Sequence, residues 1–177
     1  MTEPTEPRAI LIGPPGAGKS TVGALLAARL GVSFTDTDAE VEAVAGKPVG
    51  DIFVEDGEPA FRELERATIQ QLSQRSKTVI ATGGGLPTFG DNLEFLKTFA
   101  LTVCLWADKE KIWERVRHQS HRPLLHDPDP QKKITELLAA RAPFYKQADV
   151  LVNTGLRSPR EVAQQIELQY KLARRSN

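Results

Sequence analysis

The chain has 177 residues, which is enough for one domain with a full hydrophobic core. It carries 23 basic and 23 acidic residues, so its formal net charge is zero and gives no electrostatic argument for a nucleic-acid or membrane partner. No apolar run approaches the roughly 20 residues that cross a bilayer, and the single cysteine excludes an internal disulfide. The small size and the neutral charge favour a monomer.

Residues 1–7 are acidic and rich in proline, and we predict that they form a disordered tail. This composition is unlike that of a signal or transit peptide, so we expect a cytoplasmic protein. From there to the C-terminus, apolar strands alternate with amphipathic helices. The alternation predicts an α/β fold, a three-layer α/β/α sandwich with a parallel sheet, in a single domain over residues 8–172.

The expected elements follow from runs of apolar residues and their spacing. Strands are predicted at 8–12, 33–35, 78–81, 101–106 and 149–152, and helices at 19–30, 38–45, 58–74, 91–97, 108–117, 131–140 and 159–172. Two stretches, 46–58 and 118–130, break the alternation and are predicted to be irregular. They are either ordinary surface loops or lids over a ligand.

The run Gly-Pro-Pro-Gly-Ala-Gly-Lys-Ser at 13–20 lies between the first strand and the first helix and fits the pattern G-x-x-x-x-G-K-[ST]. Its glycines let successive backbone N–H groups surround phosphates at the positive end of the helix. Lys19 is expected to reach the β- and γ-phosphates, and the Ser20 hydroxyl to ligate Mg²⁺. The sequence therefore predicts binding of a nucleoside triphosphate.

Asp36 and Asp38 follow the second predicted strand, at the carboxyl edge where doubly wound sheets bind ligands. One carboxylate can hold Mg²⁺ through water while the other accepts a proton from a substrate hydroxyl. The alternative is that one of them caps the next helix. Capping explains one aspartate more easily than both.

Glycines and arginines supply the remaining candidates. Gly83, Gly84 and Gly85 follow the third strand and leave backbone N–H groups open to a ligand. Arg62 lies three residues before Glu65, on the same helix face. The pair is either an anion-binding arginine held in place by a carboxylate or an ordinary surface ion pair. Arg122, in the second insertion, is placed to reach the γ-phosphate when a lid closes.

Taken in order, these features make the sequence similar to the shikimate kinases from the first strand to the last helix. The motifs are the phosphate loop 13–21, Asp36-x-Asp38, Phe61-Arg62-x-x-Glu65, the triple glycine, Arg122-Pro123-Leu124-Leu125 and Arg141-x-Pro143-x-Tyr145. The resemblance implies the P-loop NTPase topology, with five parallel strands in the order 2-3-1-4-5. It also implies ATP-dependent phosphorylation of the 3-hydroxyl of shikimate, a step toward chorismate and the aromatic amino acids.

The resemblance implies a role for each matching residue. Nucleotide binding would involve Gly16, Ala17, Gly18, Lys19, Ser20, Thr21, Arg115, Arg122 and Arg157. Shikimate binding would involve Asp38, Phe53, Phe61, Arg62, Gly83, Gly84, Gly85 and Arg141. Catalysis would depend on Lys19, Asp38 and Arg122, with ATP and Mg²⁺, the metal being held by Ser20 and, through water, by Asp36. A substrate-binding segment would span about 36–66 and a lid about 118–130.

Several points stay open at the level of sequence. Asp38 either accepts the proton or only positions the hydroxyl. The acceptor could be another small polyol acid such as gluconate, and a nucleotide-dependent switch without an acceptor is a further alternative, although the chain has no N/T-K-x-D guanine-reading motif. Pro87, directly after the glycines, lacks an N–H group, which predicts the loss of one backbone contact near the site.

Overall fold

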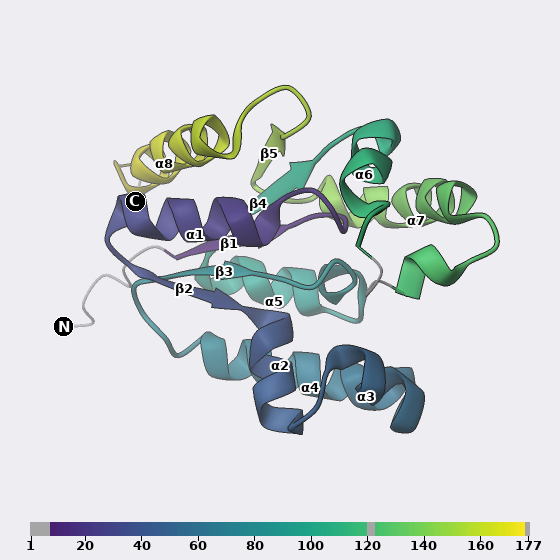
Figure 1. Ribbon diagram of the computed structural model, residues 1–177. Helices are drawn as coiled ribbons and strands as arrows, with labels where there is room; N and C mark the ends of the chain where they lie inside the picture. The colour runs from purple at the N-terminus through teal and green to yellow at the C-terminus, as the bar shows by residue number, and fades with distance from the viewer. Residues whose placement is uncertain (1–7, 120–122, 176–177) are drawn as a thin grey trace.

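A computed structural model describes residues 8–119 and 123–175 (Figure 1). Its sheet consists of β1 (Ala9–Ile12), β2 (Ser33–Asp36), β3 (Thr78–Ala81), β4 (Leu101–Trp106) and β5 (Val150–Asn153). The strand order is β2-β3-β1-β4-β5, and all four neighbouring pairs are parallel. The predicted fold class and strand order are therefore confirmed.

The helices cover both faces of this sheet. They are α1 (Lys19–Leu30), α2 (Thr37–Ala45), α3 (Val49–Glu55), α4 (Gly57–Leu72), α5 (Asn92–Phe99), α6 (Lys109–Val116), α7 (Pro130–Tyr145) and α8 (Pro159–Arg175), with 3₁₀ turns η1 (Leu86–Thr88) and η2 (Pro123–His126). Within the described ranges, none of these helices is long and apolar enough to cross a membrane. The predicted tail 1–7 lies outside the described residues.

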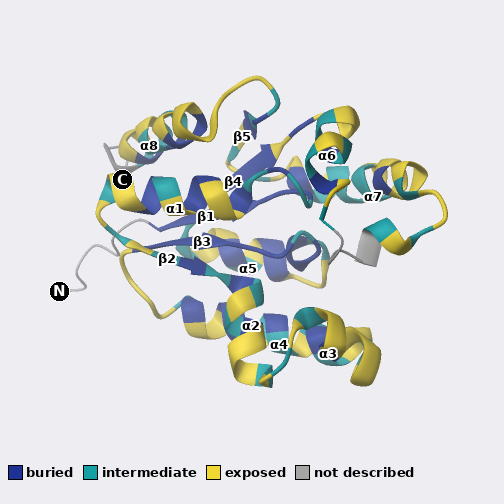
Figure 2. Cartoon of the chain, viewed as in Figure 1, coloured by how far each residue is buried: buried dark blue, intermediate teal, exposed yellow. Residues whose placement is uncertain are grey.

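The alternation of side chains along β1 divides the core into two layers. Ala9 and Leu11 pack with residues of α1 and α8, whereas Ile10 and Ile12 pack with residues of α4 and α5. Successive residues of a strand point to opposite faces, so a strand covered on both faces is apolar throughout. Figure 2 shows the result, with buried strands between helices whose outer faces are exposed.

Helices α2, α3 and α4 form a smaller unit beside the sheet (Figure 1). Its core consists of Val41, Ile52 and Phe61, one from each helix. The sequence predicted an irregular segment at 46–58, and this was wrong because α3 occupies most of it. Ile52 is fully buried against the other two helices, and this contact makes a short helix favourable there.

Helix α7 is longer than the predicted 131–140 and continues through Pro143 to Tyr145. Proline removes one backbone N–H donor from a helix and normally ends it. Here the bonding continues past the proline, because the Lys146 N–H donates to the Ala142 carbonyl oxygen at 3.0 Å. The extension has a consequence for the site, because it brings Tyr145 to the loop that follows β3.

Candidate active site

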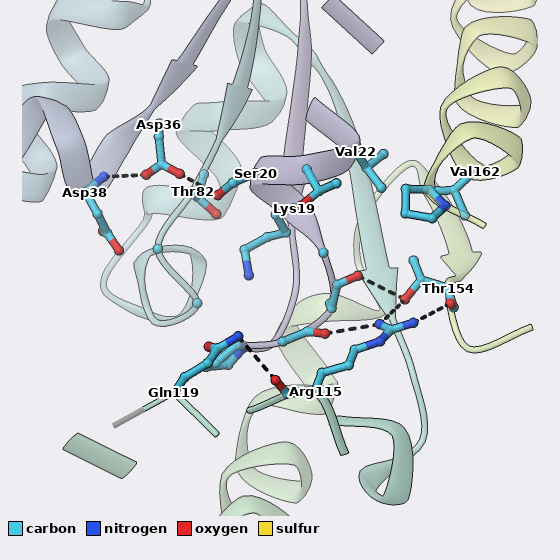
Figure 3. A pocket seen from close by; sticks show the side chains of 18 of the residues that line it. Lys19, Ser20, Val22, Asp36, Asp38, Thr82, Arg115, Gln119, Thr154 and Val162 are labelled. Carbon is cyan, nitrogen blue, oxygen red and sulfur yellow. Dashed lines mark hydrogen bonds between the residues drawn. The ribbon is translucent and has the colours of Figure 1, made fainter. Parts of the chain in front are cut away.

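A cavity of about 570 Å³ opens at the carboxyl end of the sheet (Figure 3). Many of the predicted site residues line it: Gly16, Ala17, Gly18, Lys19, Ser20, Thr21, Asp36, Asp38, Gly83, Gly84, Arg115 and Arg157. They come from the phosphate loop and the start of α1, from the junction of β2 and α2, from the loops after β3 and β5, and from helix α6. Parallel strands end at the same edge, so residues far apart in sequence meet there.

The phosphate loop approaches its neighbours too closely for side chains at two of its glycines. A Cβ at Gly13, whose φ is +139°, would lie 2.0 Å from the Leu105 carbonyl oxygen, and one at Gly16, with φ +80°, would lie 2.6 Å from Val116 Cγ1. Lys19 is largely buried, and its Nζ donates to the carbonyl oxygens of Gly13 (2.8 Å) and Pro14 (2.9 Å). Its ammonium group is thus held at the loop.

Asp36 joins the phosphate loop to α2. Its Oδ1 accepts a hydrogen bond of 3.0 Å from the N–H of Asp38, so it caps the helix. Its Oδ2 accepts one of 2.6 Å from the Ser20 hydroxyl. The two interpretations of Asp36 are therefore compatible, because capping uses one oxygen and leaves the other beside Ser20 (Figure 3).

Asp38 lies in the first turn of α2 and faces the cavity. Its Oδ1 is buried and has no hydrogen-bond partner among the described residues. Burial raises the pKa of Asp38 above its ordinary value, Asp36 raises it further, and the positive charge of Lys19 opposes both. A buried acceptor without a donor is costly unless a ligand supplies one. Asp38 is therefore suited to accept a hydrogen bond from a substrate hydroxyl.

Two arginines converge beyond the glycine loop. A Cβ at Gly85 would lie 2.9 Å from Arg62 Nη2, 3.0 Å from Arg62 Nη1 and 3.2 Å from Arg141 Nη2. Any side chain at this position would displace both guanidinium groups. Planar guanidinium groups bind carboxylates through paired hydrogen bonds, so the cluster is suited to a carboxylate ligand.

Arg62 is held on several sides. Glu58 Oε1 accepts from its Nε (3.2 Å) and Nη2 (2.9 Å), and Glu65 Oε2 accepts from its Nη1 (2.5 Å). The Phe89 ring centroid lies 3.8 Å from the guanidinium carbon. A guanidinium group over an aromatic face is attracted to the ring electrons, and this contact restricts its orientation. Glu58 and Phe89 were not identified from the sequence.

Glu65 has a strongly altered environment. Its side chain is only 1% exposed, and Oε1 lacks a hydrogen-bond partner among the described residues. Burial raises the pKa of Glu65 to about 7, although the hydrogen bond and charge of Arg62 act in the opposite direction. A Cβ at Gly83 would lie 2.6 Å from Asp38 Oδ1 and 3.2 Å from Glu65 Oε1, so glycine is required between these two carboxyl groups.

The raised pKa of Glu65 predicts a pH-dependent effect of Glu65→Gln on stability. Between pH 4.5 and about 7, Glu65 keeps its proton in the folded protein but loses it in the unfolded chain. The free energy of unfolding of the wild-type protein therefore falls as the pH rises, whereas glutamine has no proton to lose and shows no such fall. From pH 4.5 to pH 8, the unfolding free energy of the variant should rise by about 3 kcal/mol relative to wild type. Urea unfolding measures this shift. Glu63→Gln, at an exposed position of the same helix, should show no shift, and parallel curves for both variants would contradict the assignment.

Arg115 connects the phosphate loop to the segment after β5. Its guanidinium group donates to the Gly16 carbonyl oxygen (3.1 Å) and to Thr154 Oγ1 (3.0 Å) and O (2.7 Å). The Thr154 hydroxyl donates to the Ala17 carbonyl oxygen at 2.9 Å. Thr154 was not identified from the sequence, although its place directly after a strand is the signal that indicated Asp38 and the glycine loop.

The remaining predictions have mixed outcomes. Phe61 is buried in the core of the α2–α4 unit, and the exposed Phe53 packs on it with ring centroids 4.6 Å apart. Arg122 lies outside the described residues. Pro87 is buried in η1, in the first turn of a short helix, where an N–H group is not needed. It therefore removes no contact to the cavity.

The parallel sheet and the phosphate loop between β1 and α1 define a P-loop nucleotide-binding protein, in which two arginines lie beside the glycine loop that follows β3. The family model for shikimate kinase matches residues 15–171. The chain belongs to the shikimate kinase family.

Individual relatives agree with this assignment. The chain is 48% identical to the shikimate kinase of Synechococcus sp. (strain JA-3-3Ab), covering 88% of this chain and 83% of that one. The shikimate kinase of Pseudomonas savastanoi pv. phaseolicola is 44% identical over 89% of this chain and 92% of its own length. The structure of Acinetobacter baumannii shikimate kinase in complex with shikimate has a TM-score of 0.90 and 39% identity, covering 96% and 95% of the two chains.

A gluconokinase from Sinorhizobium meliloti is a more distant structural neighbour. It has a TM-score of 0.60 and 18% identity, covering 97% of this chain and 95% of its own. This similarity concerns the fold alone. The alternative of a gluconate kinase therefore gains no support from it.

Proposed function

We propose that this protein transfers the γ-phosphoryl group of ATP to the 3-hydroxyl of shikimate, producing shikimate 3-phosphate and ADP. It is a phosphotransferase with an alcohol acceptor. The observation that carries the proposal is the unpartnered, buried Oδ1 of Asp38. It lies in the cavity lined by the phosphate loop, next to the glycines on which Arg62 and Arg141 converge.

Different residues bind different groups of the two substrates. Arg62 and Arg141 bind the shikimate carboxylate through charge-assisted hydrogen bonds, and the loop N–H groups assist them. Asp38 Oδ1 accepts the hydrogen bond of the reacting hydroxyl, a donor that none of the described residues supplies. Lys19 holds the β- and γ-phosphates. Phosphoryl transfer then depends on alignment and on neutralising negative charge.

Asp38 also accepts the hydroxyl proton in this proposal. A carboxylate with an ordinary pKa is a weak base, and burial raises the pKa of Asp38. The charge of Lys19 opposes this rise and favours the ionised carboxylate, which is the form that accepts a proton. Together these effects make Asp38 a better proton acceptor than an exposed aspartate.

We propose Ser20 and Asp36 as the groups that would hold Mg²⁺. Ser20 offers a hydroxyl oxygen, and Asp36 Oδ2 lies 2.6 Å from it on the cavity wall. A hydroxyl with one carboxylate fits Mg²⁺, which usually keeps several waters and binds substrate phosphates rather than a complete protein cage. When bound, the ion would neutralise charge on the β- and γ-phosphates.

We also propose that residues 118–130 form a lid and that Arg122 reaches the transferred phosphate when the lid closes. The segment begins at the cavity, because Gln119 lines it and donates to the Arg115 carbonyl oxygen. The protein is proposed to act as a monomer in the cytoplasm. One chain supplies the phosphate loop, the aspartates and both arginines, so the site needs no residue from a second copy.

The proposed function is tested by ADP release from MgATP with shikimate, with gluconate or with no acceptor. We expect turnover to depend on shikimate and to remain at the background level with gluconate. Turnover with gluconate would reassign the acceptor, and equal ADP release under all three conditions would indicate a nucleotide hydrolase or switch. Mass spectrometry of the product distinguishes a phosphorylated acceptor from free phosphate.

Replacing Arg141 with alanine should chiefly weaken shikimate binding. Loss of a charge-assisted hydrogen bond costs about 1.5–3 kcal/mol, so the KM for shikimate should rise by about 10- to 150-fold. The KM for ATP should change little, because Arg141 belongs to the arginine cluster at Gly85 and does not line the nucleotide cavity. Steady-state kinetics with each substrate varied in turn measures both values, and an unchanged KM for shikimate would remove Arg141 from the site.

A further inference from the structure

The hydroxyl of Tyr145 makes a buried contact to which the proposed reaction gives no role. Tyr145 ends α7 and is 5% exposed. Its Oη donates a hydrogen bond of 2.7 Å to the carbonyl oxygen of Gly84. The bond joins the end of α7 to the loop after β3, between residues 61 positions apart in sequence.

The loop that receives this bond has little intrinsic rigidity. Three consecutive glycines lose more conformational entropy on ordering than any other residues would. Contacts from outside must therefore fix the loop. From outside, Thr37 Oγ1 accepts a hydrogen bond of 3.0 Å from the Gly83 N–H; within the turn, the Leu86 N–H donates to the Gly83 carbonyl oxygen at 3.2 Å. At Gly84 the anchoring contact is the Tyr145 hydroxyl.

Anchoring the Gly84 carbonyl also determines the direction of a donor. A trans peptide is planar, so the N–H of Gly85 points opposite to the C=O of Gly84. Among the described residues, the N–H groups of Gly84 and Gly85 donate to no protein acceptor. They remain available to an anion, and their direction depends on the peptide that Tyr145 holds.

The same residue lies beside Arg141. Tyr145 follows Arg141 by four positions, which places both side chains on one face of α7. A Cβ at Gly84 would lie 3.3 Å from Arg141 Nη1. Burial raises the pKa of Tyr145 to about 12 while the charge of Arg141 opposes the shift, so the hydroxyl remains a donor at neutral pH.

We propose that Tyr145 is a positioning residue for shikimate binding, because its hydroxyl holds the Gly84–Gly85 peptide in register with Arg141. The loop N–H groups and the Arg141 guanidinium group then bind the same carboxylate group of the substrate. Tyr145 acts through Gly84 and Arg141 and does not touch the substrate. The inference rests on the proposed function for the identity of the anion, whereas the anchoring of the loop stands on the structure.

The test is Tyr145→Phe, which keeps the ring and removes the hydroxyl. Thr102→Val is the matched control, because it also deletes a fully buried hydroxyl, one that donates to Asp149 Oδ2 at 2.7 Å near the start of β4. Two readouts are measured for each variant. One is the KM and kcat for shikimate and for ATP, and the other is amide hydrogen exchange at Gly83 and Leu86 in the free protein.

Tyr145→Phe should raise the KM for shikimate by about 2- to 12-fold, the value of one hydrogen bond, with the KM for ATP unchanged. Exchange at Gly83 and Leu86 should accelerate by a similar factor, and Thr102→Val should change neither readout. Unchanged exchange, unchanged KM for shikimate, or equal changes in both variants would overturn the proposal. If the wild-type protein fails to phosphorylate shikimate, the proposed function falls. The exchange rates then decide by themselves whether Tyr145 anchors the loop.

Discussion

Replacing Lys19 with methionine is expected to lower kcat by at least about 10²–10³-fold, the usual cost of removing one preorganised group that stabilises charge in the transition state. Methionine keeps an unbranched stem of similar length, so the packing of this largely buried side chain should persist. The ammonium group that Gly13 and Pro14 hold in the free protein would be absent. The loss should fall on kcat more than on the KM for shikimate.

A coupled assay for ADP with both substrates at saturation measures the effect of Lys19→Met. Lys133→Met, at an exposed position of α7, is the matched control and should retain wild-type turnover. Thermal unfolding of both variants establishes that they fold. Near-normal turnover of the Lys19 variant would disprove the assignment of the phosphate loop.

Asp38→Asn should lower kcat by about 10²–10⁴-fold, the range that a positioned proton acceptor contributes. Asparagine has the same shape and still offers an oxygen to the substrate hydroxyl, but it cannot take the proton. The KM for shikimate should therefore change less than kcat. A loss that falls mainly on kcat indicates proton transfer by Asp38. A loss of positioning alone would mainly raise the KM for shikimate.

The same change at Asp36 provides the comparison for Asp38→Asn. Asp36 Oδ1 caps α2 and Oδ2 accepts from Ser20, so Asp36→Asn should weaken metal-dependent steps and show a higher requirement for Mg²⁺. Asp38→Asn should show the wild-type Mg²⁺ requirement. A kcat for Asp38→Asn within about threefold of wild type would exclude Asp38 as the proton acceptor, because the expected loss is about 10²-fold or more.

The central strands could be predicted from the sequence because β1, β3 and most of β4 are buried. β3 and β4 are short apolar runs followed by turn signals, and both were predicted with the observed bounds. The order of the strands in the sheet was predicted from the phosphate loop and the family resemblance. The glycine loops and paired aspartates were also visible, since each follows a strand and parallel strands end at one edge.

Other features depend on contacts that no local pattern reports. α3 exists because Ile52 packs against Val41 and Phe61, which are distant in sequence or on other helices. Tyr145 reaches Gly84 across 61 residues, and Thr154 reaches Ala17 across 137. Such contacts are determined by tertiary packing. A single sequence therefore identifies the residue types but not which residues contact each other.

Arg62 is paired with carboxylate groups of the protein itself. Glu58, whose side chain is 53% exposed, accepts from two of its nitrogens, while Glu65 occupies a third. Binding of a substrate carboxylate at the Glu58 edge is then an exchange of one anion for another, with the displaced glutamate returning to water. A ligand that also contacts Arg141 or Asp38 gains interactions that offset the loss of the Glu58 contact. We therefore expect small inorganic anions, which gain no further contact, to displace Glu58 less readily than the carboxylate of a larger ligand.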